Sequence, residues 1–119
     1  MRYKTLNLKE YDPSVEQAIA LVELEIQRSI KEGYYAIKII HGYGSHGVGG
    51  VIKKELQKWK IKAKSRGLIL EYVKGENWSD SNPTVQKIKK ICPEVLGDFE
   101  LFTTNPGISV VLINKPEKI

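Results

Sequence analysis

The chain has 119 residues, of which 41% are hydrophobic and 28% charged, a composition typical of one soluble domain that is large enough to bury a core. Its single cysteine, Cys92, excludes an internal disulfide, and one cysteine with two histidines cannot form a structural zinc site. No apolar run approaches the length of a membrane span, and the start, MRYKTLNLKEY, lacks the apolar core of a signal peptide. We therefore expect a cytoplasmic single domain over residues 1–119, with no membrane contact, metal or cofactor.

The first third of the chain predicts a strand, a helix and a second strand. Residues 3–8, YKTLNL, alternate as a strand does, and residues 35–40, YAIKII, predict a strand buried on both faces. Asp12 followed by Pro13 predicts a helix start, a cap and then proline at the first helical position, and Gly33 predicts the helix end. Apolar residues recur at helical spacing in between: Val15, Ile19, Val22, Ile26 and Ile30.

A glycine-rich loop separates the second strand from a second predicted helix over residues 49–65, and Gly67 ends that helix. The apolar stripe of this helix is formed by Ile52, Leu56, Trp59 and Ala63. When each residue is turned by about 100°, the lysines fall on the two flanks of the stripe. They are Lys53, Lys60 and Lys64 on one flank and Lys54, Lys58 and Lys62 on the other. Residues 68–73, LILEYV, then predict a third strand.

Residues 75–98 interrupt this alternation, and we interpret them as an insertion. Asn82 and Pro83 predict the cap and first position of a short helix that Pro93 would end. The apolar residues of this helix are Val85, Ile88 and Ile91. Trp78 either packs the segment against the body of the domain or forms an exposed stacking surface, and we expect packing.

Two strands are expected to complete the domain. FELFTTN predicts an edge strand, and GISVVLIN, residues 107–114, predicts a closing strand rich in β-branched residues. The order of elements predicts an α/β fold: a two-layer sandwich with a mixed sheet and an insertion before the last strands.

Positive charge is concentrated in the second helix. The net charge of the chain is +5, but residues 51–67, VIKKELQKWKIKAKSRG, hold seven Lys or Arg against one acid, Glu55. The rest of the chain therefore sums to −1. Such a patch is the electrostatic footprint expected of a polyanion binder, although a basic helix face can also serve solubility alone.

The loop HGYGSHGVGG, residues 41–50, contains five glycines: Gly42, Gly44, Gly47, Gly49 and Gly50. The first three match the dinucleotide-binding pattern G-x-G-x-x-G, which follows a strand and opens a helix, and Glu71 ends the next strand. However, a strand and a helix already precede this unit, and the last two glycines make the loop longer than the tight turn of that motif. Binding of a nucleotide cofactor is therefore the third of three hypotheses for this chain.

His41 stands at the carboxyl end of the second strand, where an α/β sheet presents its ligand-facing groups. An imidazole exchanges a proton near neutral pH, and loop amides at a helix amino terminus favour phosphate. His41 therefore predicts phosphodiester binding or cleavage, with His46 as a second donor. The alternative is a structural histidine that donates to a neighbouring carbonyl and finishes the strand.

A strand followed by His41-Gly42-x-Gly44, further glycines and a helix with Trp59 near its end resembles the central motif of the Smr (small MutS-related) domain family. The closing NPGISVVLINK is similar to that family's last strand, where a glycine pair precedes a β-branched run. The resemblance covers most of the chain except about residues 75–98. It implies a compact βαβαββ sandwich similar to the carboxyl-terminal domain of a bacterial translation initiation factor.

The same resemblance implies nucleic-acid binding and, in several members, nicking of DNA or cleavage of RNA. Members stand alone or at the end of longer proteins, including a MutS relative tied to recombination control and stalled ribosomes. The first strand of the family typically ends Leu-Asp-Leu-His-Gly, with polar groups implicated in cleavage, whereas this chain has Leu6-Asn7-Leu8-Lys9-Glu10. Asn7 can hydrogen-bond but cannot act as a base, and Lys9 can pair with phosphate, so these changes favour binding over catalysis.

We therefore predict a domain that binds the phosphate backbone of DNA or RNA, nonspecifically or by structure. The predicted contacts are Lys9, His41, Gly42, Tyr43, Gly44, Ser45, His46, Gly47, Lys53, Lys54 and Lys58, with Tyr43 stacking on a base. The resemblance implies a ribosome or a repair or recombination complex as the larger partner. The alternative is an Smr-type endonuclease that nicks DNA or cleaves RNA with His41 as general acid or base.

Overall fold

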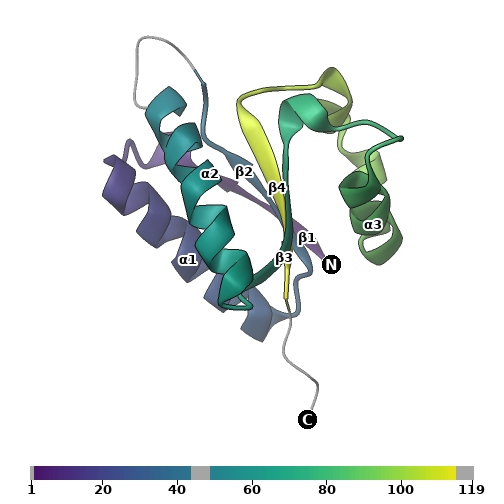
Figure 1. Cartoon of the computed structure of the whole chain (residues 1–119), viewed down its shortest axis with the longest axis horizontal. Coiled ribbons are helices and arrows are strands. Elements are labelled where there is room, and N and C mark those ends of the chain that lie inside the picture. Colours follow the sequence, from purple (N-terminus) through teal and green to yellow (C-terminus); the bar gives the residue numbers. More distant parts are fainter. Residues whose placement is uncertain (1, 44–48, 115–119) are drawn as a thin grey trace.

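A four-stranded mixed sheet forms the centre of the domain (Figure 1). The computed structural model describes residues 2–43 and 49–114. The strands are β1 (Tyr3–Asn7), β2 (Ala36–Ile40), β3 (Ile69–Lys74) and β4 (Ile108–Ile113), in the order β1-β2-β4-β3. β1 and β2 are parallel, whereas β4 lies between β2 and β3 and is antiparallel to both. The predicted α/β sandwich with a mixed sheet is confirmed, and the first four residues of β2 are buried, as expected.

Two long helices, α1 (Val15–Glu32) and α2 (Gly49–Ser65), cover one face of this sheet (Figure 1). The apolar stripe predicted for the second helix is buried, and it packs against the apolar residues of α1 and of the sheet. The core on this face includes Leu6, Val22, Ile26, Ile37, Ile39, Ile52, Leu56, Trp59, Val111 and Ile113. None of the helices in the described part of the chain is long and apolar enough to cross a membrane.

The start of α1 differs from the prediction by two residues. Ser14, not Asp12, is the cap: its hydroxyl accepts from the Gln17 amide at 3.2 Å, and the Gln17 side chain accepts from the Ser14 amide at 2.9 Å. This reciprocal capping box satisfies two free amides at once, which a lone aspartate could not do. Asp12 instead has a φ of 45° in the turn that leads from β1 to α1.

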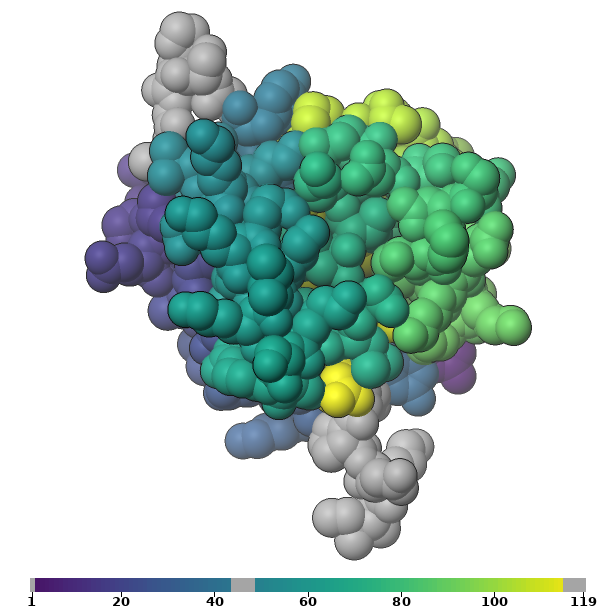
Figure 2. Space-filling model, viewed as in Figure 1, coloured from purple at the N-terminus to yellow at the C-terminus, as the bar shows by residue number. Residues whose placement is uncertain are grey.

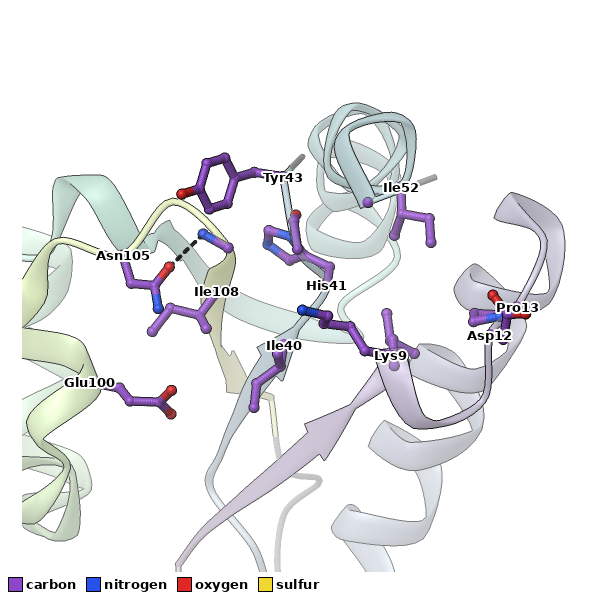
Figure 3. A pocket seen from close by; sticks show the side chains of 14 residues that line it. Lys9, Asp12, Pro13, Ile40, His41, Tyr43, Ile52, Glu100, Asn105 and Ile108 are labelled. Carbon is purple, nitrogen blue, oxygen red and sulfur yellow. Dashed lines mark hydrogen bonds between the residues drawn. The ribbon is translucent and has the colours of Figure 1, made fainter. Parts of the chain in front are cut away.

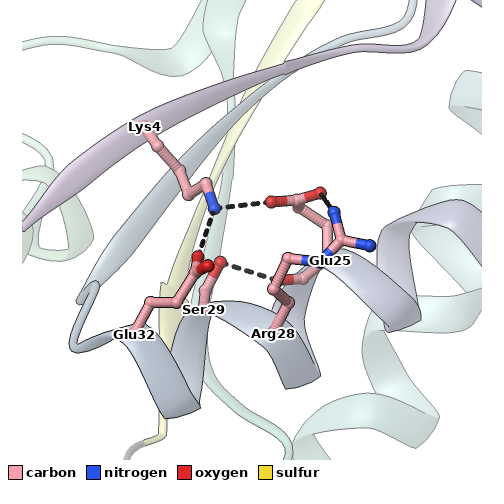
Figure 4. A network of polar contacts seen from close by, with 5 residues as sticks. All are labelled: Lys4, Glu25, Arg28, Ser29 and Glu32. Atoms are coloured by element: carbon pink, nitrogen blue, oxygen red, sulfur yellow. Dashed lines mark hydrogen bonds and ion pairs between the residues drawn. The ribbon is translucent and has the colours of Figure 1, made fainter.

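An ion-pair network fixes α1 to the edge strand β1 (Figure 4). The Lys4 ammonium lies 2.6 Å from Glu25 and 3.2 Å from Glu32, and Glu25 also contacts Arg28 at 3.3 Å. Because both partners of Lys4 are on α1, the network holds the helix in register with the strand.

The opposite face of the sheet is covered by the segment between β3 and β4 (Figure 1). It contains α3 (Pro83–Ile91) and the short 3-10 helices η2 (Gly75–Asn77), η3 (Pro93–Gly97) and η4 (Phe99–Thr103). Asn82 caps α3 as predicted, through its side-chain oxygen and the Thr84 amide at 2.8 Å. Trp78 is buried in this layer, so the expectation that it packs the segment onto the domain is confirmed.

The prediction of an edge strand at FELFTTN is wrong, because this stretch forms η4. The Asp98 side chain accepts from the Glu100 amide at 3.1 Å and starts the helical turn. Only Leu101 of η4 is buried, so the turn places one apolar anchor on the sheet and leaves its other large side chains outside.

Candidate nucleic-acid interface

A cleft of about 710 Å³ lies where β1 and β2 end, β4 begins and α2 starts (Figure 3). A fourth short 3-10 helix, η1 (Leu8–Glu10), follows β1 and places Lys9 on the wall of the cleft. In Figure 3 the Lys9 side chain extends toward the centre of the cleft, beside Ile40 and His41, and Tyr43 stands at the rim. The structure therefore brings together Lys9, His41, Gly42 and Tyr43, four of the predicted site residues.

Close backbone contacts between β2, α2 and the loop before β4 shape this cleft. Gly42 has a φ of 76°, which favours glycine. A Cβ atom on Gly49 would lie 2.9 Å from the His41 carbonyl oxygen and 3.1 Å from the Tyr43 amide nitrogen, so the first turn of α2 fits only with glycine there. The Gly107 carbonyl accepts from the amides of both His41 and Gly42 at 3.0 Å. The predicted contacts Gly44, Ser45, His46 and Gly47 lie outside the described residues.

His41 is built into the wall of the cleft, with 2% of its surface exposed. Its Nδ1 atom lies 2.6 Å from the Gly42 carbonyl oxygen and therefore donates, and its Nε2 lies 2.9 Å from the Ser109 hydroxyl. In the neutral imidazole this hydroxyl must then donate to Nε2. Burial lowers the pKa of His41; the Gly42 carbonyl opposes that shift and the nearby Lys53 ammonium adds to it. Both ring nitrogens are thus used within the protein by a neutral imidazole.

The departure from the family pattern at the end of β1 has a structural role. The Asn7 side-chain oxygen accepts from the Lys9 amide at 3.1 Å, and its nitrogen lies 3.4 Å from the Glu10 carboxylate. Asn7 therefore caps η1 and fixes the turn from which Lys9 enters the cleft.

The two lysine flanks of α2 have different surroundings. Lys53 lies 2.7 Å from Glu76 and donates to the Pro106 carbonyl at 2.9 Å, so its ammonium connects α2 to η2 and to the loop before β4. On the same flank Lys60 lies over the Tyr72 ring and Lys64 lies 3.6 Å from Glu71. The other flank consists of Lys54, Lys58 and Lys62, which are exposed and form no ion pair with the acids of the described chain.

Two acidic residues and an asparagine on the cleft wall were not predicted from the sequence to be site residues. Asp12 and Glu100 line it from opposite sides, and Glu100 is paired with the buried Lys38 of β2. The Asn105 side chain accepts from the Gly107 amide at 2.8 Å and shapes the turn before β4. An Asn-Pro-Gly sequence favours such a turn, so Asn105 could have been found, whereas Glu100 reaches the cleft only because η4 folds back over β2.

Fold and site together define an α/β domain with a cleft at the carboxyl ends of the parallel strands β1 and β2, next to the first turn of α2. No group of three or more His, Cys, Asp or Glu side chains that could hold a metal ion occurs within residues 2–43 and 49–114. The Smr domain family model matches residues 6–88, from β1 into α3. The chain therefore belongs to the Smr domain family, which indicates nucleic-acid binding or a nuclease-type function in general. A comparison with curated proteins finds no match.

Proposed function

We propose that this Smr domain binds the phosphate backbone of DNA or RNA in the cleft and along α2, nonspecifically or by structure, without cleaving it. The observation that carries the proposal is Lys9, whose side chain extends into the cleft that Gly49, the first residue of α2, also lines. Amides at a helix amino terminus and a lysine are a common combination for phosphate. Tyr43 at the rim is 59% exposed and would stack on a base.

The exposed lysines of α2 extend the positive charge away from the cleft. Lys54, Lys58 and Lys62 follow one another at helical spacing and have no acidic partner in the described chain, so their charge is available to a polyanion. Lys53, also a predicted contact, is held by Glu76, and we expect it to contribute less than Lys58. Binding through such rows releases counterions and depends strongly on salt.

The surroundings of His41 favour binding over the alternative, an Smr-type endonuclease. A general acid or base must reach the substrate, but both imidazole nitrogens of His41 already have partners inside the protein. Asn7, in the place of the family's aspartate, is occupied as the cap of η1. We further propose a cytoplasmic location and, from the family, a ribosome or a repair or recombination complex as the larger partner.

The proposal is tested by the affinity for a labelled structured RNA and a branched DNA, measured by fluorescence anisotropy at several salt concentrations. Doubling the salt concentration should weaken binding several-fold. Lys54→Glu/Lys58→Glu should weaken it about tenfold or more, whereas Lys31→Glu/Lys90→Glu, with the same change in charge on exposed lysines of α1 and α3, should have a much smaller effect. Equal effects of the two pairs, or binding indifferent to salt, would contradict the proposal.

The same samples separate binding from the two rival hypotheses. On a denaturing gel we expect intact substrate; cleavage by the wild type that is absent in a folded His41→Ala protein would establish the endonuclease. A thermal-shift screen with NAD and ATP should give no stabilisation, and a clear shift with either would support the nucleotide-cofactor hypothesis.

A further inference from the structure

The layer that follows α3 exposes a row of large apolar side chains. Phe99 is 82% exposed, Leu96 53% and Phe102 49%. Phe99 and Phe102 are three residues apart in η4, and such side chains lie above one another in a 3-10 helix. They are the only phenylalanines of the chain, whereas both tryptophans are buried. We call Phe99 and Phe102 the aromatic ridge; Leu96 is the exposed leucine that precedes them in the sequence.

The aromatic ridge stands on a firmly anchored base. Val95 and Leu101, which alternate with the exposed residues, are fully buried against the sheet. Asp98, next to Phe99, accepts from the Tyr3 hydroxyl at 2.6 Å and lies 2.8 Å from the Lys38 ammonium. A ridge held in this way loses little conformational freedom on binding, which is what a docking surface requires.

The charge around the ridge is opposite to that of α2. Three carboxylates, those of Glu94, Asp98 and Glu100, line a hollow of about 600 Å³ together with Phe99. No Lys or Arg occurs between residues 91 and 114, although the chain has 19 of them. The buried Lys38 ammonium pairs with Asp98 and Glu100, and the Arg2 backbone amide contacts Glu94 at 3.0 Å, so the three carboxylates outnumber the one ammonium that pairs with them. Such a surface repels phosphate and attracts cations.

We propose that the aromatic ridge docks a basic segment of a partner protein, with apolar side chains on the ridge and lysine or arginine in the hollow. Exposed aromatic residues are typical of protein interfaces, and a cation over Phe99 would interact with its ring as well as with the carboxylates. The ridge belongs to the layer opposite α1 and α2, and in Figure 2 α2 (teal) and α3 (green) reach the surface on different sides. Nucleic acid along α2 and a protein on the ridge can therefore bind at the same time, although Glu100 lines both the cleft and the hollow, and the inference does not depend on the proposed nucleic-acid function.

The test uses the full chain and a short fluorescein-labelled peptide that alternates leucine with lysine or arginine. Wild type should bind it with an affinity that Phe99→Ser lowers about tenfold. Leu24→Ser, which removes a leucine of α1 that is 51% exposed, is the matched control and should leave the affinity unchanged. A peptide with glutamate in place of the basic residues should show no binding that Phe99→Ser lowers, and one with serine in place of leucine should bind weakly.

Two further measurements separate the inference from its rivals. Sedimentation velocity of wild type and Phe99→Ser should show no self-association that depends on Phe99; such association would assign the ridge to a second copy of the chain. Binding of the labelled RNA and DNA should be the same for both proteins, and a loss in Phe99→Ser would make the ridge part of the nucleic-acid surface. Equal peptide binding by wild type and Phe99→Ser would overturn the proposal outright.

Discussion

The two faces of the sheet are closed in different ways. On one face, two long amphipathic helices bury continuous apolar stripes, and the outer surface of α2 carries lysines. On the other, a nine-residue helix and three short 3-10 helices bury single anchors such as Trp78 and Leu101, and the surface around η4 is acidic and aromatic. In a regular helix the helical period separates the buried side chains from the exposed ones. In short 3-10 turns each buried side chain is held by its own contacts. The face built from single contacts is thus also the face whose surface charge is opposite to that of α2.

Each face is also tied down by one strand lysine that has two carboxylate partners. Lys4 reaches Glu25 and Glu32 of α1, and 19% of its side chain is exposed. Lys38 reaches Asp98 and Glu100 on the other side of the sheet, and 7% of its side chain is exposed. The two sites are chemically alike and differ mainly in burial, so they form a natural matched pair.

The largest effect is expected at Gly75, where the layer of the second face meets the loop before β4. A Cβ atom there would overlap the Asn105 carbonyl oxygen and come within 2.8 Å of Ile108. Gly75→Ala should lower the free energy of unfolding by about 3 kcal/mol or more, because the obstacle is backbone that cannot easily move. Gly97→Ala is the control, since nothing lies within 4 Å of its added Cβ, and it should change stability by less than about 0.5 kcal/mol. Urea unfolding followed by circular dichroism measures both.

The second prediction uses the two strand lysines. Lys38→Met should lower the free energy of unfolding by about 3 kcal/mol, because it leaves the Asp98 carboxylate, 14% exposed, without its cation. Lys4→Met should lower it by about 1 kcal/mol, because Lys4 is more exposed and water replaces part of the interaction. Equal losses in the two variants would show that burial does not distinguish the faces.

The smallest effect is a pH dependence at the cleft. Because the pKa of His41 is lowered by folding, its contribution to stability is fully present above the unfolded pKa of about 6.5 and is lost as the pH falls toward the folded value. The stability advantage of wild type over His41→Asn should therefore shrink as the pH falls from neutrality. An advantage that grows or stays constant on acidification would mean that His41 is not held neutral, and would reopen its role as an acid or base.

Sequence patterns predicted the elements that rest on local chemistry. The stripe of α2, the Asn82 cap of α3 and the β-branched β4 were found because periodicity, capping and β-branching act over a few neighbouring residues. The cap of α1 was misplaced because Asp12 and Ser14 both suit a cap, and only the reciprocal bonds with Gln17 decide between them. FELFTTN was misassigned because its alternation resembles a strand, while the single anchor Leu101 and the Asp98 cap make it a turn.

The sequence by itself determined an α/β fold with a glycine loop at the end of a buried strand and a basic second helix, because these features are local or compositional. Only the tertiary structure decided which polar side chains are engaged within the protein and which are left for a ligand. Ser109, distant in sequence, engages the His41 ring, and Glu76 engages Lys53, whereas Lys9 and Lys58 have no acidic partner among the described residues. The same folding left Phe99 and Phe102 outside and their carboxylate neighbours around them. The pairing of polar side chains depends on residues that are far apart in the sequence. For that reason the chemistry of both surfaces follows from the fold.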